Sequence, residues 1–328
     1  MSKTLLIIDD STNWYEVFGR HPKLPNGDDL KIEQTEWKLI STKAAKGKAY
    51  VNISPSPNPF LFTNQKEERL VVPDMLLVRN VPINIHNTNY LNHLLTFAIA
   101  NTPAVNAVQV MVNDLNRPLL HSELLKIEKR LIELHHGDAE WEKTRIKVVD
   151  LEYNSNQGDA PSFGGAPVPE KWPQVVKVAT IHGGYGKTVV HDKKELKDVA
   201  SVIAVGNSYY TVEPFLNENY QVRVQYINGH IRAFRTRSED SWKYNWGTSE
   251  YKDVEVLPRY KEWAEEAHKI WGGLDMFAID IIMEKDGSET IIEINVSAIG
   301  ITDCNAKEDV QFVKELIMEK MDKEYYKK

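Results

Sequence analysis

The sequence predicts a protein of mixed α/β and α+β class, with a small α/β domain at residues 1–103 and a larger domain at residues 104–328. Three observations carry this prediction. Short apolar runs alternate with a helical pattern up to residue 103, strand-like runs follow one another after residue 170, and Asp286-Gly287 separates two isoleucine-rich runs. A chain of 328 residues is also long enough to bury the cores of more than one unit.

The first domain is expected to be a small doubly wound unit. Apolar runs predict strands at residues 5–10, 30–37 and 75–79, the second of them from a weaker alternation of apolar and polar residues. A helix is expected at residues 88–100, ahead of Pro103. Strands that alternate with helices in this way are typical of doubly wound domains.

The second domain is expected to open with a helix at residues 115–134, because leucines and isoleucines recur there at helical spacing. Residues 153–169 are rich in Asn, Ser, Gly and Pro and predict a loop or connector. The remaining pattern predicts strands at residues 175–180, 210–216, 221–227 and 230–237, and helices at residues 193–205, 259–271 and 307–320.

Bulk composition excludes several classes of protein. The net charge of −7 argues against a nucleic-acid-binding protein, which would show a basic excess, and gives no general attraction to anionic lipid. The single cysteine, Cys304, excludes an intrachain disulfide and fits a reducing compartment, so a cytoplasmic location is expected. No apolar run approaches the roughly 20 residues that cross a bilayer.

The Asp286-Gly287 pair predicts a β-hairpin. If the turn is centred on this pair, Asp280 lies directly opposite Glu293, for a two-residue and a four-residue loop alike. Like charges opposite each other destabilise a sheet, and a bound cation relieves their repulsion. Asn295 is expected on the same face, and two carboxylates with an amide oxygen suit Mg²⁺ or Ca²⁺. The alternative is that both acids lie on a solvated face.

Lys177 lies within Val-Val-Lys-Val-Ala, a run that is otherwise suited to a buried strand. A buried lysine needs a counter-charge or loses its proton, and a phosphate group would supply that charge. The alternative is a lysine on an edge strand whose amine reaches water.

The segment His-Gly-Gly-Tyr-Gly-Lys follows this strand. Gly183, Gly184 and Gly186 allow backbone N–H groups to turn toward an anion, and Lys187 adds a positive charge. The spacing matches neither a Walker A loop nor G-x-G-x-x-G. The segment is interpreted as a hairpin lid over phosphates, with a plain glycine turn as the alternative.

The strand predicted at residues 210–216 ends in Glu213, Pro214 and Phe215. Backbone groups at such a strand end can bind an adenine ring, and Glu213 can take part. The alternative is an ordinary edge strand.

Arginines and a lysine follow on the next strands. Arg223, Arg235 and Lys243 suit phosphate oxygens, because a guanidinium group binds them through paired hydrogen bonds. A solvated charged face is the alternative, and it is preferred for Arg232 and Arg237.

The order of these segments resembles the ATP-grasp superfamily, and within it the chain is similar to the synapsin family. The resemblance covers nearly the whole chain. It rests on Val-Val-Lys-Val with the glycine segment, Thr-Val-Glu-Pro-Phe-Leu, Tyr-Gln-Val-Arg-Val-Gln, Ser-Trp-Lys-Tyr-Asn and Ile-Trp-Gly-Gly-Leu-Asp.

The resemblance implies an ATP-grasp fold with an N-terminal pre-ATP-grasp domain, in which ATP lies between two α+β subdomains. It implies ATP contacts at Arg117, Lys177, Gly183, Gly184, Gly186, Lys187, Glu213, Pro214, Phe215, Arg223, Arg235 and Lys243. It implies that Asp280 and Glu293, with Asn295, hold Ca²⁺ or Mg²⁺. Arg117 stands where the family has a lysine, so the charge is kept but the geometry differs.

Two functions are consistent with this resemblance. The first is an ATP-binding core whose occupancy sets the state of a homodimer or homotetramer, on vesicle surfaces or elsewhere in the cytoplasm. The second is an ATP-dependent ligase that works through an acyl phosphate, with Arg235 and Lys243 facing an acidic substrate. Asn295 favours the second, because it restores the Glu-x-Asn pattern of catalytic ATP-grasp ligases. We expect the first function and leave open whether the chain turns ATP over.

Overall fold

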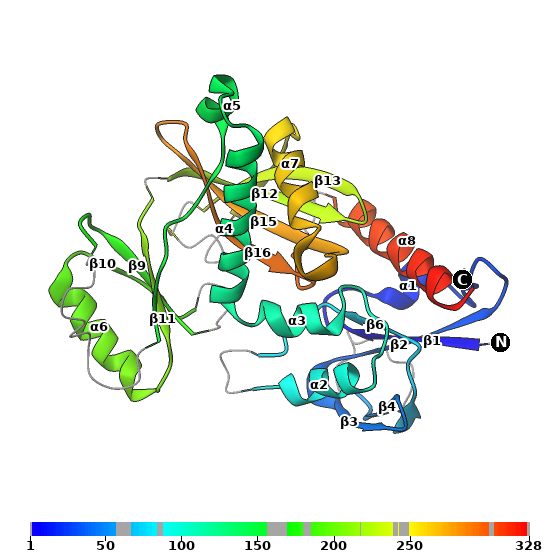
Figure 1. Cartoon of the computed structure of the whole chain (residues 1–328). Helices are drawn as coiled ribbons and strands as arrows, with labels where there is room; N and C mark the ends of the chain where they lie inside the picture. Colours follow the sequence, from blue (N-terminus) through cyan, green and yellow to red (C-terminus); the bar gives the residue numbers. More distant parts are fainter. Residues whose placement is uncertain are drawn as a thin grey trace.

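The computed structural model describes residues 2–56, 67–83, 88–155, 169–179, 185–216, 218–238, 242, 249–301 and 305–326. Its N-terminal part contains a parallel sheet in the order β2-β1-β6 (Figure 1). The central strand β1 (Ser2–Ile8) pairs with β2 (Asp29–Thr35) on one side and with β6 (Met75–Val78) on the other. These pairings confirm that strands occur at the three predicted places, although β1 begins at Ser2 and ends at Ile8 rather than at residue 10, and β2 ends at Thr35 rather than at residue 37.

A second N-terminal sheet was not predicted from the sequence. It consists of the antiparallel strands β3 (Ile40–Ala45), β4 (Lys48–Ile53) and β5 (Arg69–Val71). Val51 and Val71 of this sheet share a buried cluster with Leu94 and Phe97 of α2 (Leu91–Ile99). The expected helix at residues 88–100 therefore exists, but it begins at Leu91.

Helices and a 3₁₀ turn complete the first domain and lead into the second. They are α1 (Trp14–Phe18), the 3₁₀ turn η1 (Trp37–Leu39), α3 (Val108–Asp114), α4 (Arg117–Leu134) and α5 (Ala139–Thr144). The single helix expected at residues 115–134 begins only at Arg117. Pro118, in the first turn of α4, favours a helix start there, since its missing N–H group costs nothing at that position.

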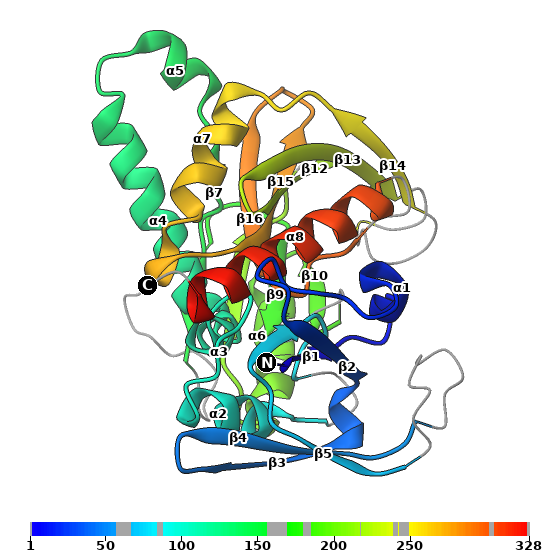
Figure 2. The same ribbon diagram turned by 90° about the vertical axis from the view of Figure 1, so that its right-hand side faces the viewer.

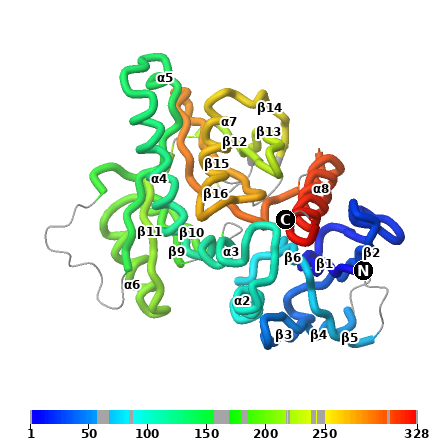
Figure 3. The backbone as a smooth tube through the Cα atoms, turned by 45° about the vertical axis from the view of Figure 1, so that its right-hand side comes forward, coloured from blue at the N-terminus to red at the C-terminus, as the bar shows by residue number. Residues whose placement is uncertain are grey.

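The second domain contains a small sheet in the order β10-β9-β11-β8, with α6 (Lys193–Val205) packed on it. Its strands are β8 (Glu152–Asn154), β9 (Gln174–Val178), β10 (Lys187–Val190) and β11 (Tyr210–Pro214). β8 corrects the expectation that residues 153–169 form a loop throughout, because it pairs with β11. Residues 156–168 lie outside the described part of the chain. Figure 3 shows this sheet and α6 to the left of the large sheet.

The large sheet has the order β14-β13-β12-β15-β16-β7. Its strands are β7 (Lys147–Val148), β12 (Glu218–Ile227), β13 (His230–Ser238), β14 (Ser249–Val254), β15 (Met276–Glu284) and β16 (Glu289–Val296). One face packs on α4 and α7 (Pro258–Ala267). The helix expected at residues 259–271 thus ends at Ala267 and is followed by the 3₁₀ turn η2 (Ile270–Gly272).

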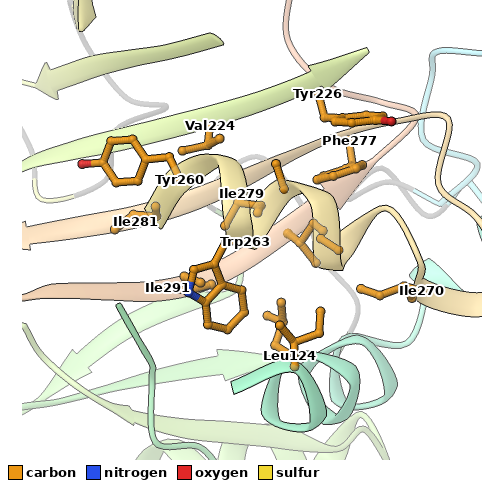
Figure 4. Close-up of a cluster of buried hydrophobic side chains, with 14 of the residues drawn as sticks. Leu124, Val224, Tyr226, Tyr260, Trp263, Ile270, Phe277, Ile279, Ile281 and Ile291 are labelled. Carbon is orange, nitrogen blue, oxygen red and sulfur yellow. The ribbon is translucent and has the colours of Figure 1, made fainter. Parts of the chain in front are cut away.

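Figure 4 shows the hydrophobic core between this sheet and its helices. Tyr226 of β12 stacks on Phe277 of β15, with ring centroids 4.9 Å apart. Trp263 of α7 and Leu124 of α4 pack toward Ile291 of β16 in the same cluster. Because this face is filled with apolar side chains, the polar residues of β12, β15 and β16 are left for the opposite face.

α8 (Ala306–Tyr325) joins the two domains, since it lies between the N-terminal parallel sheet and the large sheet (Figure 2). Val313 and Ile317 of α8 share one buried cluster with Leu5 of β1 and Met276 of β15. This continuous core fixes the position of the first domain against the second. No helix in the described ranges is long and apolar enough to cross a membrane.

Candidate functional site

A cavity of about 740 Å³ lies between the small sheet and the polar face of the large sheet. Its charged lining residues are Lys177, Lys187, Glu213, Glu218, Arg223, Asp280 and Glu293. Phe215 and Trp242 form part of an apolar wall, with their rings edge to face at 5.8 Å.

The β15–β16 hairpin places Asp280 directly opposite Glu293, which confirms the predicted pairing. The loop, however, is neither of the two expected. Glu284 N–H donates to the carbonyl oxygen of Ser288, so the loop has three residues, with Gly287 at a φ of +88°. Ile292 is an extra, bulged residue in β16, because Asp280 pairs with Glu293 while Ile281 pairs with Ile291. The bulge and the odd loop length compensate each other.

Asp280 is 1 % exposed and both of its oxygens are occupied. Arg223 Nε donates to Asp280 Oδ1 at 2.6 Å, and Arg223 Nη2 donates to Oδ2 at 2.8 Å. Asn295 Nδ2 donates to the same Oδ2 at 3.0 Å. Burial raises the pKa of Asp280, and the bidentate pair with Arg223 opposes this rise. The structure therefore brings together three of the predicted residues, and arginine neutralises the buried carboxylate.

Glu293 is paired with the first residue of α4, since Arg117 Nη1 lies 3.1 Å from Glu293 Oε2. A second cavity of about 480 Å³ lies behind this pair and is lined by Asp114, His121 and Asn295 among others. Burial, together with the negative charge of Glu293, raises the pKa of Asp114 to about 8. Arg117 thus reaches the predicted metal face from outside the sheet.

Lys177 lies on β9, an inner strand between β10 and β11, and it is 6 % exposed. This position excludes the edge-strand alternative. Its Nζ is paired with Glu213 Oε2 of β11, a counter-charge that the sequence analysis did not assign to it. Burial lowers the pKa of Lys177, although Glu213 opposes the shift. Lys187 lies directly opposite Lys177 at the start of β10, and both line the cavity.

The remaining predicted residues divide into three groups. Pro214 and Phe215 line the cavity at the end of β11, and Gly186 lies in the turn before β10 with a φ of +61°. Arg235 pairs directly with Val222, whose side chain belongs to the apolar core, so Arg235 lies on the opposite face of the sheet from Arg223. Gly183, Gly184 and Lys243 lie outside the described residues.

Some residues of this region were not predicted from the sequence. Gln221 lines the cavity and shares the face of Arg223 two residues on, so the period of two along β12 could have identified it. Asp114 precedes α4 by a short connection, and only its position in the fold brings it near Glu293.

No group of three or more His, Cys, Asp or Glu side chains suited to a metal ion occurs among the described residues. Asp280 and Glu293 offer two carboxylates, and Asn295 offers an amide. Such a set fits Mg²⁺, which in nucleotide sites is bound by one or two carboxylates together with phosphate oxygens. The residues present are therefore suited to a cation that arrives with a nucleotide.

The fold is that of ATP-grasp proteins. The D-Ala:D-Ser ligase VanG of Enterococcus faecalis superposes with a TM-score of 0.63 at 13 % identity, covering 96 % of this chain and 98 % of that one. The D-alanine–D-alanine ligase of Bacillus anthracis, solved with ATP, gives 0.55 at 14 % identity over 98 % and 97 % of the two chains. The ligase PsnB, solved with Mg and ADP, gives 0.56 at 12 % identity over 98 % and 99 %.

Within this class the chain belongs to the synapsin family. Residues 1–104 match the synapsin pre-ATP-grasp domain, and residues 106–323 match the synapsin ATP-binding domain, which supports ATP binding. The chain is also 24 % identical to synapsin of Drosophila melanogaster over 324 residues. The match covers 97 % of this chain and 30 % of the fly protein, so the chain spans under a third of that relative's length.

Proposed function

We propose that this protein binds ATP together with a divalent cation in the cavity between its two sheets, and that binding rather than turnover is its function. Lys177, Lys187, Arg117 and Arg223 would contact the phosphates. Glu213, Pro214 and Phe215 would contact adenine or ribose. Asp280 and Glu293, with Asn295, would hold the cation.

A single observation carries this proposal. Residues from distant parts of the sequence, on β9, β10, β12, β15 and β16, bring cations and a carboxylate pair to the walls of one cavity, and Arg117 of α4 pairs with Glu293 from the neighbouring cavity. A nucleotide triphosphate with its metal requires this combination, because its phosphates need positive partners and its cation needs oxygen ligands. A purely structural ion-pair network would not require an open cavity between the pairs.

Mg²⁺ is the cation we favour over Ca²⁺. Mg²⁺ keeps most of its ligands from water and phosphate and needs few protein oxygens, whereas Ca²⁺ takes six to eight oxygen ligands. The described residues supply two carboxylates and one amide at this position. Binding of Ca²⁺ at this site stays a prediction that rests on the family resemblance alone.

The experiment is calorimetric titration of the full chain with ATP, in Mg²⁺, in Ca²⁺ and in a chelator. We expect tight binding that depends on the metal, with Glu293→Gln removing the metal dependence. Asp253→Asn is the matched control, because Asp253 is an exposed acid on β14 outside the cavity. Metal-dependent binding that survives unchanged in Glu293→Gln would place the cation elsewhere.

A ligase is the second candidate, and Asn295 favours it, since it completes a Glu-x-Asn pattern with Glu293 and its Nδ2 donates to Asp280. Several proteins of similar fold are ligases. ADP release with Mg·ATP, alone and with pooled amino acids and small carboxylic acids, separates the two functions. Release that requires one pool and vanishes in Glu293→Ala would establish a ligase, and its absence alongside ATP binding supports the binding function.

Oligomer formation and vesicle association are proposed on the family membership alone. ATP with metal is expected to shift the chain between monomer and a homodimer or homotetramer, measured by light scattering during size-exclusion chromatography. Flotation with vesicles that carry anionic lipid tests membrane association, and a chain that never floats would remove the vesicle role.

A further inference from the structure

Three of the four positive residues that are expected to meet phosphate are already paired with acids in the structure. Lys177 is paired with Glu213, Arg223 with Asp280, and Arg117 with Glu293. Two of these three acids are the proposed metal ligands. The cavity is therefore close to electrically balanced before any ligand enters, and a triphosphate must compete with carboxylates for the arginines.

We propose that the divalent cation and the two arginines exchange partners. The cation takes Asp280 and Glu293, and Arg223 and Arg117 are thereby released to bind the phosphates. One doubly charged ion replaces two singly charged groups on two carboxylates, so the charge around the acids is conserved. This inference rests on the proposed ATP and metal site and adds how the two ligands depend on each other.

The contacts of Asp280 show why the cation and Arg223 compete. A carboxylate has about four acceptor positions. Arg223 takes one on each oxygen, and Asn295 takes a second on Oδ2. Three of the four positions are thus taken, and a cation on the remaining position of Oδ1 would lie beside the positive guanidinium group, which repels it. Loss of Arg223 is possible without leaving a buried charge only if the guanidinium group finds another anion, and the phosphates supply it.

The two arginines are better suited to move than Lys177. The side chains of Arg117 and Glu293 are 15 % and 20 % exposed, and that of Arg223 is 20 % exposed although its partner Asp280 is only 2 % exposed. Those of Lys177 and Glu213 are 8 % and 3 % exposed, so in this pair the cation itself is deeply buried. Breaking a deeply buried pair leaves two unsolvated charges and is strongly destabilising. Arg117 Nη1 lies 3.1 Å from Glu293 Oε2, and Arg223 is held to Asp280 by two short hydrogen bonds. Exchange is thus assigned to the arginine pairs, with the lysine pair remaining in place.

The exchange makes metal and nucleotide binding mutually dependent. Metal alone would leave two arginines without partners, and ATP alone would find its arginines held by carboxylates. Each ligand removes the cost that opposes the other, and this coupling must be equal in both directions. Removal of the negative charge of Asp280 should therefore have opposite effects on ATP with and without metal.

The test is the ATP affinity of Asp280→Asn in a chelator and in Mg²⁺. Because an ion-paired hydrogen bond contributes about 1.5–3 kcal/mol, release of Arg223 should raise the metal-free affinity roughly tenfold or more. In Mg²⁺ the same variant should bind more weakly than the wild-type chain. Glu293→Gln, which releases Arg117, should show the same reversal to a smaller extent. Thermal unfolding of each variant checks that it is folded.

Two further variants serve as controls for the metal-free ATP affinity. Arg223→Gln combined with Asp280→Asn should lose the metal-free gain, since the gain is assigned to the released guanidinium group. Asp253→Asn removes the same charge outside the cavity and should leave the metal-free affinity unchanged.

The outcomes separate this inference from the proposed function. Weaker or unchanged metal-free binding in both Asp280→Asn and Glu293→Gln overturns the exchange, while Mg²⁺-dependent binding by the wild-type chain would still support the ATP site. A wild-type chain that binds no ATP with or without metal overturns both. If Asp253→Asn raised the metal-free ATP affinity as much as Asp280→Asn does, the gain would reflect the change in net charge. This result would also overturn the exchange.

Discussion

Asp280 lies directly opposite Glu293 on the β15–β16 hairpin because a bulge at Ile292 offsets a loop of odd length. Without the bulge, the register near the turn would place Ile292 opposite Asp280 and turn Glu293 out of this pair. The bulged Ile292 side chain lines both cavities, so the same feature pairs the acids and shapes the walls beside them. Bulges commonly re-aim side chains next to functional sites.

This geometry predicts a backbone cost for replacing Gly287. Its φ of +88° is one that residues with a Cβ adopt only with strain, although no atom lies within 4 Å of the added carbon. Gly287→Ala should lower the free energy of unfolding by about 1 kcal/mol, measured by urea denaturation. Gly206→Ala is the control, because Gly206 has a φ of −84°, which alanine adopts freely. Equal losses in the two variants would contradict a backbone origin.

The hairpin also shows which structural features the sequence predicts and which it does not. The Asp-Gly signal and the two isoleucine-rich runs predicted the correct pairing of Asp280 with Glu293, but two departures from regular geometry cancelled to produce it. Neither the three-residue loop nor the bulge has a clear signal in the pattern. The predicted pairing of the two acids is confirmed, and the predicted turn is wrong.

The partners of Lys177 and Arg223 could not be predicted, because they depend on strand order. Lys177 meets Glu213 since β9 lies beside β11, and Arg223 meets Asp280 since β12 lies beside β15. Each of these strands was predicted by its own pattern, but local patterns do not show which strands pair. Arg235 illustrates the same limit, as its pairing with Val222 turns it to the other face.

The missed β3–β4–β5 sheet did leave a signal. Ala49, Val51 and Ile53 alternate with polar residues and are buried, as expected of a strand with one face on a core. Lys46 and Gly47 both have positive φ, at 51° and 69°, which is the geometry of a tight hairpin turn. Because Lys-Gly is not among the strong turn pairs, the sequence pattern alone does not predict this hairpin.

Arg79 is predicted to anchor the segment that follows β16. Its Nη1 and Nη2 donate to the carbonyl oxygens of Ser297 and Ile299, at 2.7 and 2.6 Å, and its side chain is buried. Arg79→Met leaves both carbonyls without these donors and should cost about 2–4 kcal/mol of stability. Faster hydrogen exchange at residues 297–301 than elsewhere in the variant checks the assignment.

Arg130→Met is the comparison for this variant. Arg130 is 53 % exposed and pairs with Glu266, so its loss should cost less than about 1 kcal/mol. Similar losses of unfolding free energy for the two arginines would mean that the Arg79 contacts contribute little.

Asp114 should make the stability of the folded chain fall with rising pH. Its pKa is raised to about 8 by burial, with Glu293 adding to the shift, from an ordinary value near 4 in the unfolded chain. Between these values the folded state holds a proton that the unfolded state lacks, so stability decreases as pH rises and levels off above pH 8. Asp114→Asn should remove part of this decrease, measured by urea denaturation at about pH 5 and about pH 8.5.

The exposed acid Glu133 on α4 provides the control for that experiment. Its side chain is 68 % exposed, and Glu133→Gln should leave the pH dependence of stability as it is in the wild-type chain. A slope that Asp114→Asn does not change would show that Asp114 remains ionised in the folded protein.

Lys177 should make ATP affinity fall at alkaline pH. Burial lowers its pKa in the free protein, and the phosphates of a bound nucleotide would raise it again. Between the two pKa values the complex holds a proton that the free protein lacks. ATP binding is therefore strongest below the pKa of Lys177 in the free protein and weakens by up to about tenfold per pH unit above it.

Lys177→Arg, which stays charged, should flatten this pH dependence of ATP affinity, whereas Lys194→Arg on the exposed side of α6 should preserve it. Calorimetric titrations across neutral and alkaline pH measure the effect, and a wild-type affinity independent of pH would show that Lys177 is fully protonated without the nucleotide.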